Sequence, residues 1–188
     1  MSDYYYQLEN SFLSHEETDI LLKIVQAKWD DFAPFIGDNP LAPYVTHYNN
    51  IFLHTNIFRT LAEFNCSKIL KMLFTCKLKA FPTFARQDPF AHLLRHKDIS
   101  RKTILSVPLS PIEYSPTYFW EDKDSAEPLA IATFPDKNPC LMNVDILHGL
   151  ENLSSEYRIN FQIGFREPFS EVRKYLNDGS LFPSVGSY

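Results

Sequence analysis

Two histidines and an aspartate in this sequence have the types and the spacing of a metal site. His96 and Asp98 are separated by a single residue, and His148 follows Asp98 by fifty positions. A histidine at the end of a strand and an aspartate in the following turn can converge on one ion, which a second histidine from a distant strand would complete. Two imidazoles and one carboxylate bind non-haem Fe(II) and leave three coordination positions open. The spacing therefore predicts a metal centre that does chemistry.

An arginine ten residues after His148 could bind an anion beside that metal. Arg158 opens a predicted strand, Arg158–Phe165, in which apolar residues alternate with polar residues and one glycine. Its position puts Arg158 on the polar face of that strand. A guanidinium group can bind a carboxylate through two parallel hydrogen bonds, a geometry that lysine cannot match. We therefore expect Arg158 to bind a carboxylate of a small molecule.

The order of these residues resembles that in the 2-oxoglutarate/Fe(II)-dependent dioxygenases, whose core is a double-stranded β-helix, or jelly roll. In that family a His-x-Asp pair is followed about fifty residues later by a histidine, and then by an arginine. The flanking segments are similar as well: residues 103–109 resemble the strand after His-x-Asp, and residues 147–152 resemble the segment around the distal histidine. The resemblance covers about residues 78–165.

This resemblance implies a ligand set and a reaction. His96, Asp98 and His148 would ligate Fe(II), and Arg158 would pair with the distal carboxylate of the cosubstrate 2-oxoglutarate. Dioxygen would be the oxidant, with succinate and CO2 as coproducts. Because relatives with a small residue in place of the aspartate leave room for a halide, Asp98 favours hydroxylation of a C–H bond over halogenation.

The family often supplies one more hydroxyl or amide group to the cosubstrate carboxylate, at a position that varies between members. Several residues of the expected core could take this role. They are Thr103, Ser106, Tyr118 and Asn160. The sequence leaves the choice among them open, with Thr103 and Asn160 as the leading candidates.

The elements that must position these residues change character along the chain. A Ser-x-x-Glu capping box at Ser14 predicts a helix to about residue 28, and a second helical region spans about 56–74 with a break near 65–67. Short alternating runs follow. The expected strands are 78–85, 90–95, 103–109, 117–121, 129–134, 140–143 and 158–165, with a C-terminal helix at 168–176.

Helices first and strands afterwards predict an α+β fold with a double-stranded β-helix core and N-terminal helices packed on it. We expect one domain over residues 1–188. It would comprise a helical support region to about residue 76, a jelly-roll catalytic core over about 77–166, and a C-terminal helix and tail over 167–188. A chain of this length can bury a core without a structural metal or disulfide.

Composition limits the partners. With 18 Lys+Arg against 23 Asp+Glu, the net charge is -5, which disfavours nucleic acid and anionic membrane surfaces. Three cysteines without metal-finger spacing disfavour a disulfide framework, and no targeting or transmembrane segment is evident. We expect a soluble cytoplasmic protein that acts on a small molecule or a peptidyl side chain, with its oligomeric state left open.

Three other interpretations compete with the dioxygenase. His92 and His96 have the spacing of half a helical zinc site, but Leu93 stands where a metallopeptidase needs glutamate. We expect His92 to be packed or to line a pocket.

A cupin-type metal enzyme that does not use 2-oxoglutarate would need His-x-His followed by glutamate, and neither feature occurs here. The alternative of a different class is a non-catalytic jelly-roll module, for binding or of the virion type.

Overall fold

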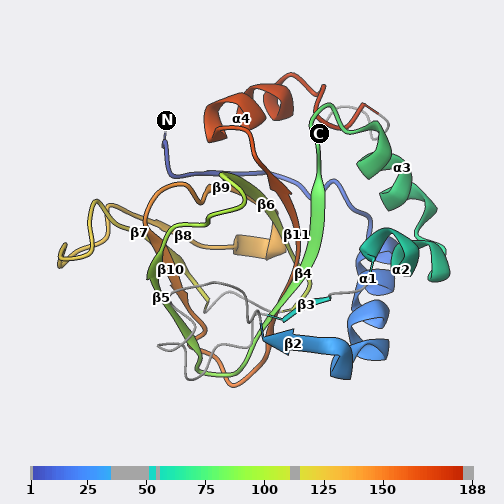
Figure 1. Ribbon diagram of the computed structural model, residues 1–188, viewed down its shortest axis with the longest axis horizontal. Coiled ribbons are helices and arrows are strands. Elements are labelled where there is room, and N and C mark those ends of the chain that lie inside the picture. The colour runs from blue at the N-terminus through green and yellow to red at the C-terminus, as the bar shows by residue number, and fades with distance from the viewer. Residues whose placement is uncertain (1, 35–50, 54–55, 111–114, 184–188) are drawn as a thin grey trace.

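The computed structural model describes residues 2–34, 51–53, 56–110 and 115–183, and these form two antiparallel sheets with helices on one side. In Figure 1 the four-stranded sheet lies at the left, helices α1, α2 and α3 lie at the right, and α4 lies at the top. The first sheet has five strands in the order β1-β9-β6-β11-β4. They are β1 (Tyr5–Gln7), β4 (Phe81–Gln87), β6 (Thr103–Pro108), β9 (Cys140–Asn143) and β11 (Arg158–Phe165).

The second sheet, in the order β5-β10-β7-β8, carries both candidate histidine ligands. Its strands are β5 (His92–His96), β7 (Thr117–Phe119), β8 (Ala130–Ala132) and β10 (His148–Glu151). A small core that contains Ile104, Met142, Phe119 and Ala132 joins residues of both sheets. The two sheets therefore pack face to face as a β-sandwich. Outside them, β2 (Phe32–Pro34) and β3 (Ile51–Leu53) form a separate two-stranded pair.

Helices cover the outer face of the five-stranded sheet. They are α1 (His15–Ala27), α2 (Ile57–Glu63), α3 (Ser67–Thr75) and α4 (Phe169–Asn177), with short 3-10 turns at Trp29–Asp31 and Pro135–Lys137. The larger core cluster joins apolar residues of these helices to the outward residues of β4, β6 and β11. The predicted capping box opens α1: the Glu17 amide donates to Ser14 Oγ, and the Ser14 amide donates to the Glu17 carboxylate.

Strand β11 separates the helix side from the space between the sheets. Ile159, Phe161, Ile163 and Phe165 belong to the core under the helices. Arg158, Asn160 and Gln162 take the opposite face, toward the four-stranded sheet. Because all eight residues of β11 are buried, its polar face is a buried polar surface inside the sandwich.

The expected α+β fold with two packed antiparallel sheets is confirmed, and strands 140–143 and 158–165 have the predicted bounds. The helical region over 56–74 is two helices separated by Asn65, whose φ is 58°. Three strands of the described residues were not expected: the N-terminal β1, which pairs with β9; β3, which pairs with β2; and β10, which begins at His148. Most of the loop expected over 30–50 lies outside the described residues. Among the described residues, no helix is long and apolar enough to cross a membrane.

Candidate metal centre

Neighbouring strands bring the two histidines together. His96 is the last residue of β5 and His148 is the first of β10, and the two are paired across the strands. Asp98 lies in the loop after β5, where its backbone amide donates to the carbonyl of Val144 at 3.0 Å. The loop is thus tied to the segment that leads into β10, and residues fifty positions apart meet at one end of the four-stranded sheet.

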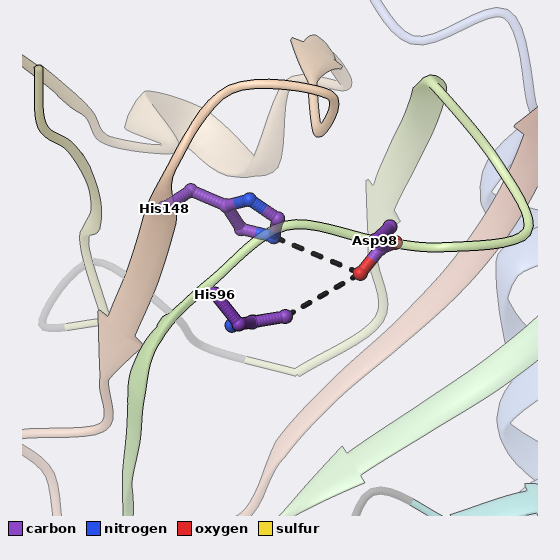
Figure 2. Close-up of side chains that lie close together, drawn as sticks. All are labelled: His96, Asp98 and His148. Atoms are coloured by element: carbon purple, nitrogen blue, oxygen red, sulfur yellow. Dashed lines mark ion pairs between the residues drawn. The ribbon is translucent and has the colours of Figure 1, made fainter. Parts of the chain in front are cut away.

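The three side chains face one another, as Figure 2 shows. Nε2 of His96 lies 3.3 Å from Oδ1 of Asp98, and Nε2 of His148 lies 4.0 Å from the same oxygen. One ligand atom from each residue can be chosen so that all three lie within 4.8 Å of one another. Two imidazole nitrogens and a carboxylate oxygen are the donor set that suits Fe(II), so these residues fit the ion that the sequence predicts.

Backbone carbonyls orient both rings. Nδ1 of His96 lies 2.9 Å from the carbonyl oxygen of Leu94, and Nδ1 of His148 lies 2.9 Å from that of Ile146. Because a carbonyl oxygen can only accept, each Nδ1 carries the proton. Nε2 is therefore the nitrogen that each ring, in its neutral form, can offer to a metal, which is the usual arrangement of a metal-binding histidine.

The electrostatics of the site favour the protonation states that bind a metal. Burial alone would raise the pKa of Asp98, but the Arg101 guanidinium and the hydrogen bond to His96 hold that pKa well below its usual range. Burial, together with the neighbouring His96, lowers the pKa of His148 to about 4. At neutral pH the carboxylate is therefore charged and the His148 ring neutral, as ligation requires.

Arg158 lies inside the sandwich, as its place on the polar face of β11 predicts. It is 2% exposed, and its Nη1 donates to Oε1 of Gln87 on the neighbouring strand β4 at 3.0 Å. Its guanidinium carbon lies 5.5 Å from the ring centre of Phe134. The register pairs Arg158 directly with Gln87.

The amides around Arg158 fit an anionic cosubstrate. Asn160 is fully buried, and its Oδ1 accepts from Ser106 Oγ at 3.3 Å. Within the described part of the chain, Nδ2 of Asn160 and Nε2 of Gln87 are buried amide donors without a hydrogen-bond partner. Such donors are rare in folded proteins unless a ligand or water satisfies them. A carboxylate placed beside Arg158 would do so.

Two of the candidates for the second cosubstrate contact lie elsewhere. Thr103 is on the helix-side face of β6, opposite Phe165, and its hydroxyl donates to the carbonyl of Glu167 at 2.9 Å. The hydroxyl of Tyr118 donates to the carboxylate of Glu151 at 3.1 Å. Thr103 and Tyr118 therefore make their hydrogen bonds away from Arg158. Asn160 and Ser106, in contrast, lie on the same face of the five-stranded sheet as Arg158.

His92 is exposed, although it shares strand parity with His96. The pairing of β5 with β10 explains this. His148 pairs with His96, whereas Leu150 pairs with Leu93, so β5 contains one extra residue between these pairs. A bulge of this kind turns the preceding residues to the other face of the sheet. Leu93 is consequently buried and His92 points outward.

Three residues near the site were missed in the sequence. Arg101 donates from Nε to Oδ2 of Asp98 at 2.5 Å and from Nη1 to Oε1 of Gln162 at 3.1 Å. The third is Gln87, the partner of Arg158. Gln162 could have been predicted to face the site, because it lies on the polar face of β11. Nothing in the sequence pattern distinguishes Arg101 from an arginine in a surface turn.

Comparison with solved structures shows which proteins share this fold. No family model and no curated protein sequence matches this chain. A prolyl-4-hydroxylase from Pseudomonas putida is similar over 87% of this chain and 92% of its own, at 14% identity and a TM-score of 0.53. A prolyl hydroxylase from Trichoplax adhaerens, in complex with a hypoxia inducible factor peptide fragment, covers 87% and 84%, at 10% identity and a TM-score of 0.53.

A third similar structure is SnoN, a non-haem α-ketoglutarate-dependent epimerase from nogalamycin biosynthesis. It covers 86% of this chain and 75% of its own, at 11% identity and a TM-score of 0.54. The chain thus shares the fold of these enzymes, a double-stranded β-helix, over most of its length, and within that fold His96, Asp98 and His148 form the cluster predicted to hold a metal. The resemblance stated from the sequence is confirmed at the level of fold and triad.

Proposed function

We propose that this protein is an Fe(II)- and 2-oxoglutarate-dependent dioxygenase that hydroxylates a C–H bond of a small molecule or a peptidyl side chain, with succinate and CO2 as coproducts. The observation that carries the proposal is the convergence of His96 and His148, through Nε2, on one carboxylate oxygen of Asp98. A surface ion pair alone would not explain why two separate backbone carbonyls orient the two histidine rings.

Each group would have a separate task. His96, Asp98 and His148 would hold Fe(II) on one side and leave its other positions open. Arg158, with the amides of Gln87 and Asn160, would bind and orient the distal carboxylate of 2-oxoglutarate inside the sandwich. The bound iron and oxo-acid supply the oxidative chemistry, and the protein supplies orientation and a water-poor site. Buried Phe119 and Phe134 contribute apolar walls between the sheets.

The reaction class and the substrate are proposed on different grounds. Hydroxylation is supported by Asp98, which fills the third ligand position. The peptidyl alternative draws on two similar structures that are prolyl hydroxylases, and the small-molecule alternative on SnoN, which is an epimerase. At these identities the similarity concerns the fold, so both substrate classes belong in the test.

An anaerobic titration tests the proposal directly. Apo-protein is titrated with Fe(II) and then with 2-oxoglutarate, and we expect the visible charge-transfer band of the chelate in the wild type but not in His148→Ala. Asp145→Ala is the matched control, because Asp145 is exposed and its carboxylate lies 3.9 Å from Nζ of Lys102 at the surface. In air, succinate formation is then measured with a panel of metabolites and peptides, and Asp98→Ala should abolish it.

Other outcomes would favour one of the two alternative functions. No band in the wild type, or an equal band in His148→Ala, would favour a non-catalytic jelly-roll module. Metal-dependent turnover that needs no 2-oxoglutarate would favour a cupin-type enzyme.

A further inference from the structure

Arg101 distinguishes the two oxygens of the Asp98 carboxylate. Oδ1 faces both histidine rings, at 3.3 Å from Nε2 of His96 and 4.0 Å from Nε2 of His148. Oδ2 accepts from Nε of Arg101 at 2.5 Å. The side chains of Asp98 and Arg101 are each 15% exposed, so this ion pair is largely shielded from solvent. One carboxylate oxygen is therefore turned to the metal site and the other is already engaged.

The guanidinium is itself anchored to the sheet. Its Nη1 donates to Oε1 of Gln162 at 3.1 Å. Gln162 lies on the same polar face of β11 as Arg158, four residues further along a strand that pairs with β4 and β6. Gly164 gives the side chain room, because a Cβ there would lie 3.0 Å from Cδ of Arg101. The loop that carries Asp98 is thus fixed to the most extensively paired strand of the five-stranded sheet.

We propose that Arg101 is a positioning residue that restricts Asp98 to ligation through Oδ1 alone. This inference rests on the proposed metal site and concerns how its third ligand is held. Withholding Oδ2 preserves the coordination positions that the cosubstrate and dioxygen need, whereas a carboxylate free to rotate could bind through both oxygens. Arg158 and Gln162 then link the cosubstrate site and the metal site through one strand.

Charge and positioning predict opposite effects when Arg101 is removed. A guanidinium beside the site repels a divalent cation, so if only its charge mattered, Arg101→Gln would bind metal more tightly. If Arg101 positions Asp98, the same substitution weakens binding, and loss of such outer-shell partners typically costs about 10- to 100-fold in metal affinity. The direction of the change therefore discriminates between the two.

The experiment is a Co(II) titration of the metal-free protein, followed by the visible d–d spectrum, which reports ligand number and geometry. We expect Arg101→Gln to lose about 10- to 100-fold in affinity and to change the spectrum. Arg101→Lys should recover part of both, because lysine keeps the charge but not the fork, and Gln162→Met should fall between wild type and Arg101→Gln. Lys102→Gln is the matched control, since Lys102 pairs with Asp145 at the surface, with both side chains about half exposed.

The spectrum separates positioning from folding, because it reports the geometry of the ligands around bound Co(II) and not the fraction of the protein that is folded. Wild-type affinity and spectrum in Arg101→Gln, or tighter binding in that variant, would overturn the positioning role while leaving the proposed function intact. A wild-type protein that takes up no Co(II) would overturn the proposed function and the positioning role together.

Discussion

A Cβ atom on Gly149 would lie 2.7 Å from the carbonyl oxygen of Leu93. The same atom would lie 3.2 Å from the ring of Trp120 and 3.4 Å from the amide of Arg95. Gly149 follows His148 on β10, opposite the bulge in β5. The absence of a side chain thus lets the two ligand-bearing strands approach closely at the point where β5 turns His96 inward.

Gly149→Ala should therefore disturb both the fold and the metal site. Two of the three contacts are with backbone atoms, which cannot move aside alone, so we expect a loss of about 1–3 kcal/mol in the free energy of unfolding. We also expect weaker Co(II) binding, because the two strands that would move apart carry His96 and His148. Urea denaturation and metal titration measure the two effects. Leu153→Ala, at a position 57% exposed, is the control and should change neither; wild-type behaviour of Gly149→Ala would contradict the close approach.

Asn152 closes the loop at the end of β10 with five side-chain hydrogen bonds, one of them accepted from the Ser154 amide at 3.3 Å. Its Nδ2 donates to the carbonyls of Asp88 at 2.9 Å and Glu156 at 2.7 Å. Its Oδ1 accepts from the hydroxyls of Ser115 at 2.9 Å and Ser154 at 2.8 Å. The residue is 1% exposed, so water cannot replace these partners.

We expect Asn152→Ala to lower the free energy of unfolding by about 2–4 kcal/mol, because it leaves several partners unsatisfied at a buried position. Asn152→Asp should be at least as harmful, since a carboxylate oxygen would then face two carbonyl oxygens. Chemical denaturation measures both. Asn138→Ala, which loses an exposed bond to the carbonyl of Glu9, should cost much less; equal costs at the two positions would argue against a buried network.

The convergence of His96, Asp98 and His148 could be predicted because its signal lies in residue type and chain spacing. Which candidates for the second cosubstrate contact share a face with Arg158 could not be predicted. All six residues of β6 are buried, so that strand has no polar and apolar alternation to indicate which face Thr103 and Ser106 take. Only its pairing with β11 shows that Ser106 shares the face of Asn160.

The prediction that His92 is packed or lines a pocket was wrong for a different reason. Parity assigns His92 and His96 to one face only while the strand stays regular, and a single extra residue in β5 reverses the assignment. Strand β10 was missed because it is short and contains Gly149, which has low strand propensity. These irregular features are close to the metal site, where local pattern is least informative.

The free thiol of Cys76 should react slowly in the native protein. Burial, aided by the charge of Glu167, raises the pKa of this thiol from 9.0 to about 11, although a hydrogen bond from the backbone of Leu78 opposes the rise. Because the thiolate is the nucleophile, a shift of this size lowers its fraction at pH 8 by about 100-fold. The buried thiol of Cys66 is shifted to about 11 as well.

A thiol-reactive chromogenic disulfide measures this. We expect reaction at pH 8 to be about 100-fold slower in native than in urea-unfolded protein, and the native rate to rise about tenfold per pH unit from 8 to 10. A native rate that levels off near pH 9 would show an ordinary thiol and contradict the raised pKa.

Arg158→Lys tests the carboxylate site separately from the metal site. Lysine keeps the charge but loses the planar fork and the donation to Gln87, so 2-oxoglutarate should bind about 10- to 100-fold more weakly, as expected when one charge-assisted hydrogen bond is lost. Co(II) affinity should stay at the wild-type value. The control is Arg86→Lys, also a buried arginine on this sheet: Arg86 is 8% exposed, and its guanidinium lies 4.0 Å from the ring centre of Trp29. Arg86 occupies the helix-side face of β4, so its replacement should lower stability without changing the affinity for 2-oxoglutarate. An equal loss of affinity in both variants would show general destabilisation and would contradict recognition of 2-oxoglutarate by Arg158.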